Sequence, residues 1–282
     1  MNNVEIKHID DAAILANGVR MPWLGLGVLH IAEGKQVENA VRWALEAGYR
    51  HIDTAAVYGN EVGVGQAIKQ SGMPREEIFV TTKVWNSDQG YDHTLAAFET
   101  SLQRLRLDYV DLYLVHWPVK DKFKETWRAL ETIYDSGRTR AIGVSNFLRH
   151  HLENLLETAR LVPMVNQVEF HPYLQQPELQ SLCREHQIQL EAWRPIMKGR
   201  VNQLPELVAL ADKYGKTPVQ VTLRWMMQRG IVTIPKSEQE HRIQSNADLY
   251  DFELEPPDLA VIDGLDQAER LGEDPDNFNF DF

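Results

Sequence analysis

Short apolar runs alternate with segments of helical periodicity along this chain of 282 residues. Runs of strand character recur about every 30 residues, the length of one strand–helix unit. Strictly alternating strands and helices predict an α/β fold with a parallel sheet, and eight strands favour closure into a (β/α)8 TIM barrel. The expected strands cover residues 23–28, 51–53, 79–83, 110–116, 141–145, 164–169, 189–193 and 232–234.

Reactive side chains stand at the ends of three successive apolar runs. Asp53 ends the second run, Lys83 follows it by 30 residues, and His116 follows Lys83 by 33. The carboxyl ends of barrel strands converge on one mouth, where TIM barrels hold their active sites. Tyr58 stands in the loop after Asp53, just before a helix that opens with an acidic residue. We therefore expect the four side chains to meet at that mouth.

Further elements are expected before and after the repeating units. Asn17-Gly18 between two apolar segments is a strong hairpin signal, and the hairpin would cover the bottom of the barrel. Two helical patterns, 204–214 and 218–228, lie between the seventh and eighth strands, and a third, 256–265, follows the eighth. No Gly/Ser-rich or Pro-rich linker divides the chain, so we expect residues 1–282 to form a single barrel domain.

Composition argues against several classes of function. A net charge of −12 disfavours nucleic-acid and anionic-membrane partners, because both demand a cationic face. The single cysteine, Cys183, allows no internal disulfide and suits a reducing compartment. The first residues are charged, and no run reaches the about 18 apolar residues of a membrane span. We expect a cytoplasmic monomer that acts on a small molecule.

Glycine motifs for a different nucleotide-binding fold do not fit. The glycines at 25–27 do not continue as GxGxxG, and the GVGQAI at 63–68 falls inside a helical pattern rather than at a strand-to-helix turn. A Rossmann domain is accordingly not expected.

The segments HIDTAAVYGNE, TTKVW and LYLVHWP together resemble the aldo-keto reductase superfamily. The similarity runs from Gly25 to the aromatic tail, and the nearest branch looks like the bacterial diketogluconate and glyoxal or methylglyoxal reductases. It implies a (β/α)8 barrel that reduces aldehydes and ketones with NADPH. Small dicarbonyls or keto-sugars are the substrates that this branch suggests.

The resemblance implies a catalytic role for each of the four side chains at the mouth. Tyr58 would protonate the carbonyl oxygen, and His116 would orient the carbonyl for hydride attack. Physically, Lys83 should stabilise the tyrosinate and so depress the phenol pKa, while Asp53 keeps Lys83 charged and aimed. The competing interpretations are a merely structural Asp53–Lys83 ion pair and a core histidine.

Three residues at strand ends suit the nicotinamide of the cofactor. Ser145, Asn146 and Gln167 offer hydroxyl and amide groups that match a carboxamide, although Ser-Asn after a strand is commonly a helix cap. By resemblance, Trp193 stacks on the nicotinamide ring. Many relatives have Tyr-Ser where this chain has Trp193-Arg194, which leaves the phosphate contact of that serine open.

A basic segment near the C-terminus predicts an anion site. Lys236 and Ser237 are expected to open a helix, and Arg242 and Asn246 lie four apart on one face of it. By resemblance, this cluster holds the 2′-phosphate of NADPH, with Asn246 near the adenine. The alternative is a solvated charged helix. Val28 stands where many relatives have threonine, so the ribose contact is open.

Aromatic residues are expected to line the substrate pocket. Trp85 and Trp117 each follow a catalytic strand end, unless they serve only as barrel packing, and the tail carries Phe278, Phe280 and Phe282. An apolar mouth would exclude water from the reacting groups.

We expect no metal, since neither His150-His151 nor His171-Pro172 matches a metal-ligand spacing and the chain has no HExxH motif. Two other functions remain open. One is a lyase or aldolase that forms a Schiff base on Lys83. The other is a non-catalytic regulatory barrel that binds NADPH.

Overall fold

Eight parallel strands form the barrel in the computed structural model, which describes residues 6–280. Each strand pairs with the next in chain order, and the first and last are joined by hydrogen bonds from Gly25 N to Thr233 O and from Thr233 N to Trp23 O. The strands are β3 (Leu26–Gly27), β4 (His51–Asp53), β5 (Phe79–Val84), β6 (Val110–Val115), β7 (Thr139–Ser145), β8 (Val165–Glu169), β9 (Gln189–Trp193) and β10 (Val232–Thr233).

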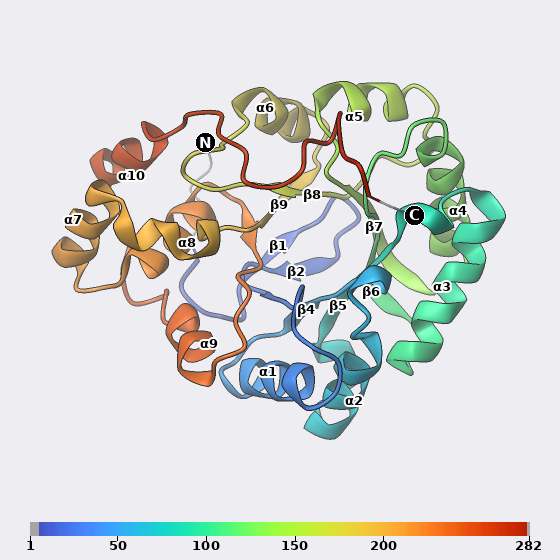
Figure 1. Cartoon of the computed structure of the whole chain (residues 1–282), viewed down its shortest axis with the longest axis horizontal. Coiled ribbons are helices and arrows are strands. Elements are labelled where there is room, and N and C mark those ends of the chain that lie inside the picture. The colour runs from blue at the N-terminus through green and yellow to red at the C-terminus, as the bar shows by residue number, and fades with distance from the viewer. Residues whose placement is uncertain (1–5, 281–282) are drawn as a thin grey trace.

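Helices surround this ring of strands, as Figure 1 shows. Buried apolar side chains of the helices join the hydrophobic core around the strands, and in most helices an amphipathic pattern explains which face is buried. The helices are α1 (Lys35–Glu46), α2 (Glu61–Ser71), α3 (Tyr91–Leu105), α4 (Phe123–Asp135), α5 (Arg149–Leu156), α6 (Pro177–Glu185), α7 (Pro205–Tyr214), α8 (Pro218–Gln228), α9 (Glu240–Ala247) and α10 (Pro256–Asp263).

The expected hairpin closes the bottom of the barrel. Strand β1 (Ala12–Ile14) pairs antiparallel with β2 (Arg20–Pro22). In the turn between them, Asn17 Nδ2 donates to the Arg140 carbonyl at 2.9 Å. Arg140 lies at the amino-terminal end of β7, so the hairpin sits at the end opposite the expected site. The prediction of a hairpin at Asn17-Gly18 is confirmed.

The additional helices also lie where the sequence predicts them. Helices α7 and α8 follow the seventh barrel strand, and α10 follows the eighth. Thr217 caps α8 by accepting the N–H of Gln220 at 3.2 Å, and Pro218 occupies the first turn. These elements explain why the last unit is longer than the others.

The first barrel strand is shorter than the sequence predicts. The first barrel strand was expected over 23–28 but spans only Leu26–Gly27, because the residues before it bond to Thr233 as isolated bridges rather than a continuous ladder. The GVGQAI glycines lie inside α2, as expected. A Cβ on Gly65 would stand 2.0 Å from the Leu105 carbonyl oxygen, so close packing against the end of α3 requires a glycine there.

Candidate active site

Asp53 and Lys83 form a buried ion pair at the barrel mouth. Lys83 Nζ lies 2.7 and 2.8 Å from the two carboxylate oxygens of Asp53 and donates to the Thr54 carbonyl at 2.9 Å. Burial is the largest single effect on the pKa of Lys83 and acts to lower it, but the charge and hydrogen bond of Asp53, together with Tyr58 and Glu191, raise the pKa overall. A lysine held charged in this way is a poor nucleophile, and the Schiff-base alternative is not supported.

Tyr58 lies beside this pair, in the short 3₁₀ helix formed by Ala56–Tyr58. Lys83 Nζ is 5.1 Å from the centroid of the Tyr58 ring. Burial raises the pKa of Tyr58 to about 12, even though the Lys83 ammonium acts to lower it. Our expectation of a depressed phenol pKa is therefore wrong in its net direction, because desolvation of the tyrosinate exceeds the attraction of the cation. The phenol keeps its proton at neutral pH.

His116 follows β6 at the same mouth. Its ring makes edge-on contacts with Tyr58 and Trp85, at centroid distances of 5.7 and 5.0 Å. Burial, with help from the Lys83 charge, holds the pKa of His116 well below its ordinary value, so the imidazole is neutral. Its buried Nδ1 has no hydrogen-bond partner among residues 6–280. The ring is thus free to donate one hydrogen bond into the cavity.

The residues expected around the nicotinamide lie together. Trp193 Nε1 donates to Asn146 Oδ1 at 2.8 Å, and Asn146 Nδ2 donates to the His116 carbonyl at 2.9 Å. Ser145 Oγ donates to the backbone carbonyl of Gln167 at 2.9 Å. Asn146 adopts a positive φ of 64°, a backbone conformation that asparagine tolerates.

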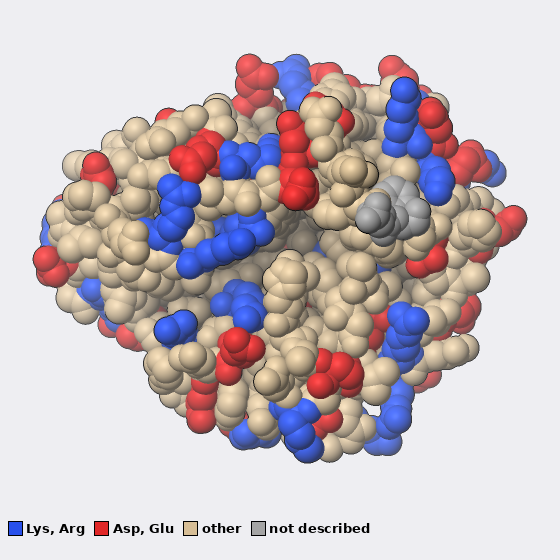
Figure 2. All heavy atoms as spheres, viewed as in Figure 1, with Lys and Arg blue, Asp and Glu red and all other residues tan. Residues whose placement is uncertain are grey.

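The predicted anion cluster lies farther along the same cavity. Lys236, Ser237, Arg242 and Asn246 all line it. We expected Lys236 and Ser237 to open the helix, but α9 begins at Glu240. The Ser237 hydroxyl instead accepts the Gln239 N–H at 3.2 Å and forms a local turn first. Lys236 Nζ rests 3.4 Å from a carboxylate oxygen of Glu238. Figure 2 shows a hollow at the centre of this face, with Lys and Arg side chains along its left side.

Aromatic rings close one side of the mouth. Phe280 lies 5.4 Å from Trp85 and 5.1 Å from Trp117 between ring centroids, so it bridges the two tryptophans. Phe278 packs 5.0 Å from Trp117 and does not line the cavity, whereas Phe280 does. Phe282, also expected in this wall, is outside the described residues.

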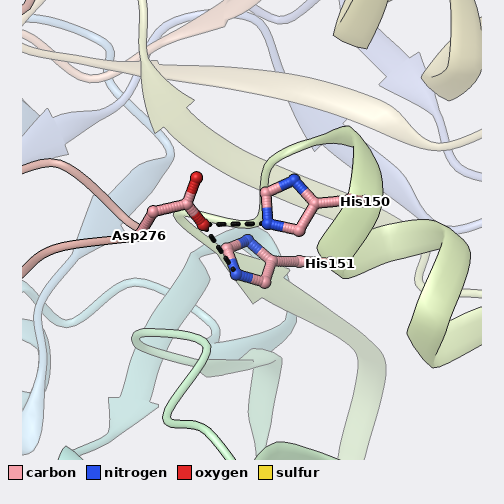
Figure 3. A group of neighbouring side chains, drawn as sticks. All are labelled: His150, His151 and Asp276. Atoms are coloured by element: carbon pink, nitrogen blue, oxygen red, sulfur yellow. Dashed lines mark hydrogen bonds and ion pairs between the residues drawn. The ribbon is translucent and has the colours of Figure 1, made fainter.

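The C-terminal tail is fastened to α5 by a small polar cluster, shown in Figure 3. His150 Nε2 and His151 Nε2 lie 2.8 and 3.3 Å from Asp276 Oδ1. His151 Nδ1 accepts the Leu148 N–H at 3.2 Å, and burial lowers the pKa of His151 to about 4. A neutral imidazole that accepts at Nδ1 carries its proton on Nε2, so that nitrogen has no lone pair for a metal. These contacts hold the C-terminal tail against α5.

Other functional candidates were missed at the sequence level. Glu191 and Glu169 are fully buried carboxylates on strands β9 and β8. Glu169 accepts the N–H groups of Leu271 and Gly272 at 2.9 and 3.1 Å and so holds the tail. Glu191 stands two residues before Trp193, and strand alternation places both on one face, which is the signal that could have found it.

The two positions that depart from many relatives have defined surroundings. Val28 is fully buried and does not line the cavity. The Arg194 guanidinium donates to the Leu271 carbonyl, lies 3.8 Å from Glu169 and stacks 5.2 Å from the centroid of Trp193. Arg194 therefore ties the tail to the aromatic residue of the proposed cofactor site.

One cavity of about 1470 Å³ extends from Tyr58 and His116 past Asn146, Gln167 and Trp193 to Lys236, Arg242 and Asn246. That volume exceeds the roughly 300–1,000 Å³ of a site for a drug-sized ligand, and a dinucleotide together with a small substrate would fill it. An aromatic platform at one end and cations at the other match a nicotinamide ring and a phosphate. Among residues 6–280, no helix has the length and apolar character to cross a membrane.

Comparison with known proteins agrees with this chemistry. The sequence profile described as "Aldo/keto reductase family" matches residues 24–267. Glyoxal reductase of Bacillus subtilis (strain 168) is 57% identical over 272 residues, which cover 96% of this chain and 99% of that protein. Methylglyoxal reductase DkgA of Escherichia coli (strain K12) is 46% identical over 268 residues, covering 94% and 96%. The crystal structure of a Gox0644 D53A mutant in complex with NADPH has a TM-score of 0.89 at 41% identity, covering 95% and 98%.

A parallel barrel with a tyrosine, a charged lysine and a neutral histidine beside a dinucleotide-sized cavity defines a carbonyl oxidoreductase. The chain belongs to the aldo-keto reductase family. Its members reduce aldehydes and ketones to alcohols with NADPH, and this chain is an NADPH-dependent oxidoreductase of that kind.

Proposed function

We propose that this aldo-keto reductase acts on small dicarbonyls and keto-sugars, with Tyr58 as the general acid. The observation that carries the proposal is that Tyr58 and His116 line the same cavity as Lys236 and Arg242. A reacting carbonyl at the first pair and the phosphate of a dinucleotide at the second can therefore share one space. The names of the glyoxal and methylglyoxal reductases among its relatives agree with this substrate class.

Four side chains have separate roles in the reduction of the carbonyl group. Bound NADPH supplies the hydride. Tyr58 gives its proton to the carbonyl oxygen, and the neutral His116 donates a hydrogen bond that holds the same oxygen in place. Lys83 stabilises the tyrosinate that forms, while Asp53 keeps Lys83 charged and aimed. Because the wall around them is aromatic, water is kept from the reacting groups.

Ser145, Asn146, Gln167 and Trp193 are proposed to hold the nicotinamide, and Lys236, Ser237, Arg242 and Asn246 the adenosine end with its 2′-phosphate. Removing the two cations at that end should weaken the preference for NADPH over NADH. In Lys236→Ala/Arg242→Ala we expect the ratio of kcat/KM values to fall by roughly 10–150-fold, since one charge-assisted hydrogen bond is worth about 1.5–3 kcal/mol. Lys35→Ala is the control, because Lys35 is 83% exposed and outside the cavity. An unchanged ratio in the double variant would remove these residues from phosphate binding.

Phe280 is expected to limit the size of the substrate, together with Trp85 and Trp117. In Phe280→Ala the gap between the two tryptophans opens, so bulky aromatic aldehydes should gain about 10-fold in kcat/KM relative to methylglyoxal, the effect of one pocket-wall contact. Phe278→Ala is the matched control, because this ring touches Trp117 and Phe280 but does not line the cavity. If the kcat/KM ratio shifted equally in both variants, the effect would come from a loosened tail and not from the contact of Phe280 with the substrate.

A panel of carbonyl compounds, monitored by NADPH absorbance, tests the substrate class. Methylglyoxal, glyoxal and a diketogluconate should be reduced with higher kcat/KM than long-chain or polycyclic ketones. The reverse order would contradict the proposal.

We further propose that residues 1–282 work as one domain and as a monomer in the cytoplasm. The cavity of this chain already holds the groups proposed for both ends of the cofactor, from Asn146 and Trp193 to Lys236 and Arg242, which supports a site that is complete in one chain. The buried Cys183 suits a reducing compartment. Light scattering should give the mass of a single chain, 32.4 kDa. A dimer mass at micromolar concentration would contradict the monomer.

A further inference from the structure

Glu191 is a fully buried carboxyl group that no catalytic step above uses. It lies on β9, beneath the site, and its Oε2 accepts a hydrogen bond from Gln167 Nε2 at 2.8 Å. Its other oxygen has no hydrogen-bond partner among residues 6–280 and lies 3.6 Å from His51 Nε2. Such a group costs free energy to bury, so its presence calls for a role.

The side chain of Gln167 is held between two carboxyl groups. Its Nε2 donates one hydrogen to Glu191 Oε2 and the other to Asp53 Oδ2, each at 2.8 Å. Because an amide nitrogen carries two hydrogens, both are used. A reversed amide would place its oxygen against the Asp53 carboxylate, which repels it. The polar atom of Gln167 that is left for a ligand in the cavity is its Oε1, a hydrogen-bond acceptor.

We propose that Glu191 is a positioning residue for the cofactor: it fixes the Gln167 amide so that Oε1 faces the cavity and accepts an N–H of the nicotinamide carboxamide. The inference rests on the proposed placement of the nicotinamide beside Gln167. Asp53 alone occupies one hydrogen of the amide. Glu191 occupies the second, and without it that buried N–H is left unsatisfied and the amide is free to turn.

The surroundings of Glu191 favour the neutral, protonated form of its carboxyl group, which can still accept a hydrogen bond from Gln167. Burial, and after it the charge of Asp53, raises the pKa of Glu191 to about 8. The carboxyl group is therefore largely protonated at neutral pH, and its carbonyl oxygen accepts from Gln167. A glutamine at position 191 would keep such an acceptor in the same place, whereas a methionine would keep the length of the side chain and remove the acceptor.

The first test uses the native protein and equilibrium binding. Calorimetric titrations are made with NADP⁺, with its thionicotinamide analogue and with its 3-acetylpyridine analogue, whose methyl ketone has an acceptor but no N–H. We expect the acetylpyridine form to bind about 10-fold more weakly than NADP⁺, the effect of one lost hydrogen bond, and the thioamide form to bind within about 3-fold. Equal affinity for all three would overturn the proposal. If NADP⁺ itself fails to bind, the proposed cofactor role of the cavity fails instead.

The second test compares variants by the same titrations. In Glu191→Met the roughly 10-fold preference for NADP⁺ over the acetylpyridine form should fall to about 2-fold or less, and Glu191→Gln should retain it. Thr233→Val is the matched control, because it removes from the neighbouring strand another buried polar atom that has no hydrogen-bond partner in the described part of the chain, without touching Gln167. A merely structural Glu191 would weaken both ligands equally and keep the preference, which would overturn the proposal. Should Glu191→Met fail to melt cooperatively, Glu191→Leu replaces it, and the native comparison decides if neither folds.

Discussion

Replacing Tyr58 with phenylalanine is expected to lower kcat for carbonyl reduction by about 10²–10⁴-fold, the usual contribution of a positioned general acid. The phenol is the group beside the neutral His116 that carries a transferable proton, since burial raises the pKa of Tyr58 to about 12. Phenylalanine keeps the ring that packs against His116. Single-turnover hydride transfer, followed by the loss of NADPH absorbance, measures the effect.

The affinity for NADPH should change by less than about 3-fold in the same variant, because only a hydroxyl group is lost. Tyr113→Phe is the matched control: it also removes a buried phenol oxygen, which has no partner among the described residues, but from inside β6. Its kcat should equal that of the native protein. A Tyr58→Phe enzyme within threefold of native activity would remove Tyr58 from the acid role.

The second large effect is expected in Lys83→Met. Removing one member of a buried ion pair leaves the other charge uncompensated, which costs about 3–5 kcal/mol of unfolding free energy. Lys83 is fully buried and Asp53 is 2% exposed, so solvent cannot take the place of the ammonium. Activity should fall as well, since the tyrosinate loses its cation. Urea unfolding and steady-state kinetics measure the two losses.

The pH dependence of this variant distinguishes charge from packing. Burial already acts to raise the pKa of Asp53, and Lys83 opposes it. Without Lys83 the folded-state pKa of Asp53 lies further above its unfolded value. Destabilisation should therefore be smallest at low pH, where the carboxyl is protonated in both states, and grow as pH rises through the raised pKa.

A double variant supplies the control. Asp53→Asn/Lys83→Met removes both charges, so it should recover part of the unfolding free energy without recovering activity. If Lys83→Met and the double variant are equally unstable at pH 8, the loss comes from packing and not from an uncompensated carboxylate.

Local sequence determined most of the barrel and pointed to the side chains that we propose as reactive. Each strand requires a short apolar run, and each helix requires an apolar stripe. Both patterns lie within one strand–helix unit of about 30 residues. Asp53, Lys83 and His116 end such runs, so their meeting at one mouth follows from the parallel barrel alone. The helix cap at Thr217 and the hairpin at Asn17-Gly18 are local signals of the same kind.

Tertiary structure decided the burial, the hydrogen-bond partners and the pKa values of these groups. The net pKa of Tyr58 depends on how far burial outweighs Lys83, and no local pattern contains that balance. Asp276 meets His150 across 126 residues, and Gln167 meets Asp53 across 114. Desolvation and hydrogen bonding depend on neighbours that chain folding brings together from distant positions. For that reason the fold and the meeting of Asp53, Lys83 and His116 at one mouth could be predicted from the sequence, whereas the protonation states, the contacts of the tail and the place of Glu191 could not.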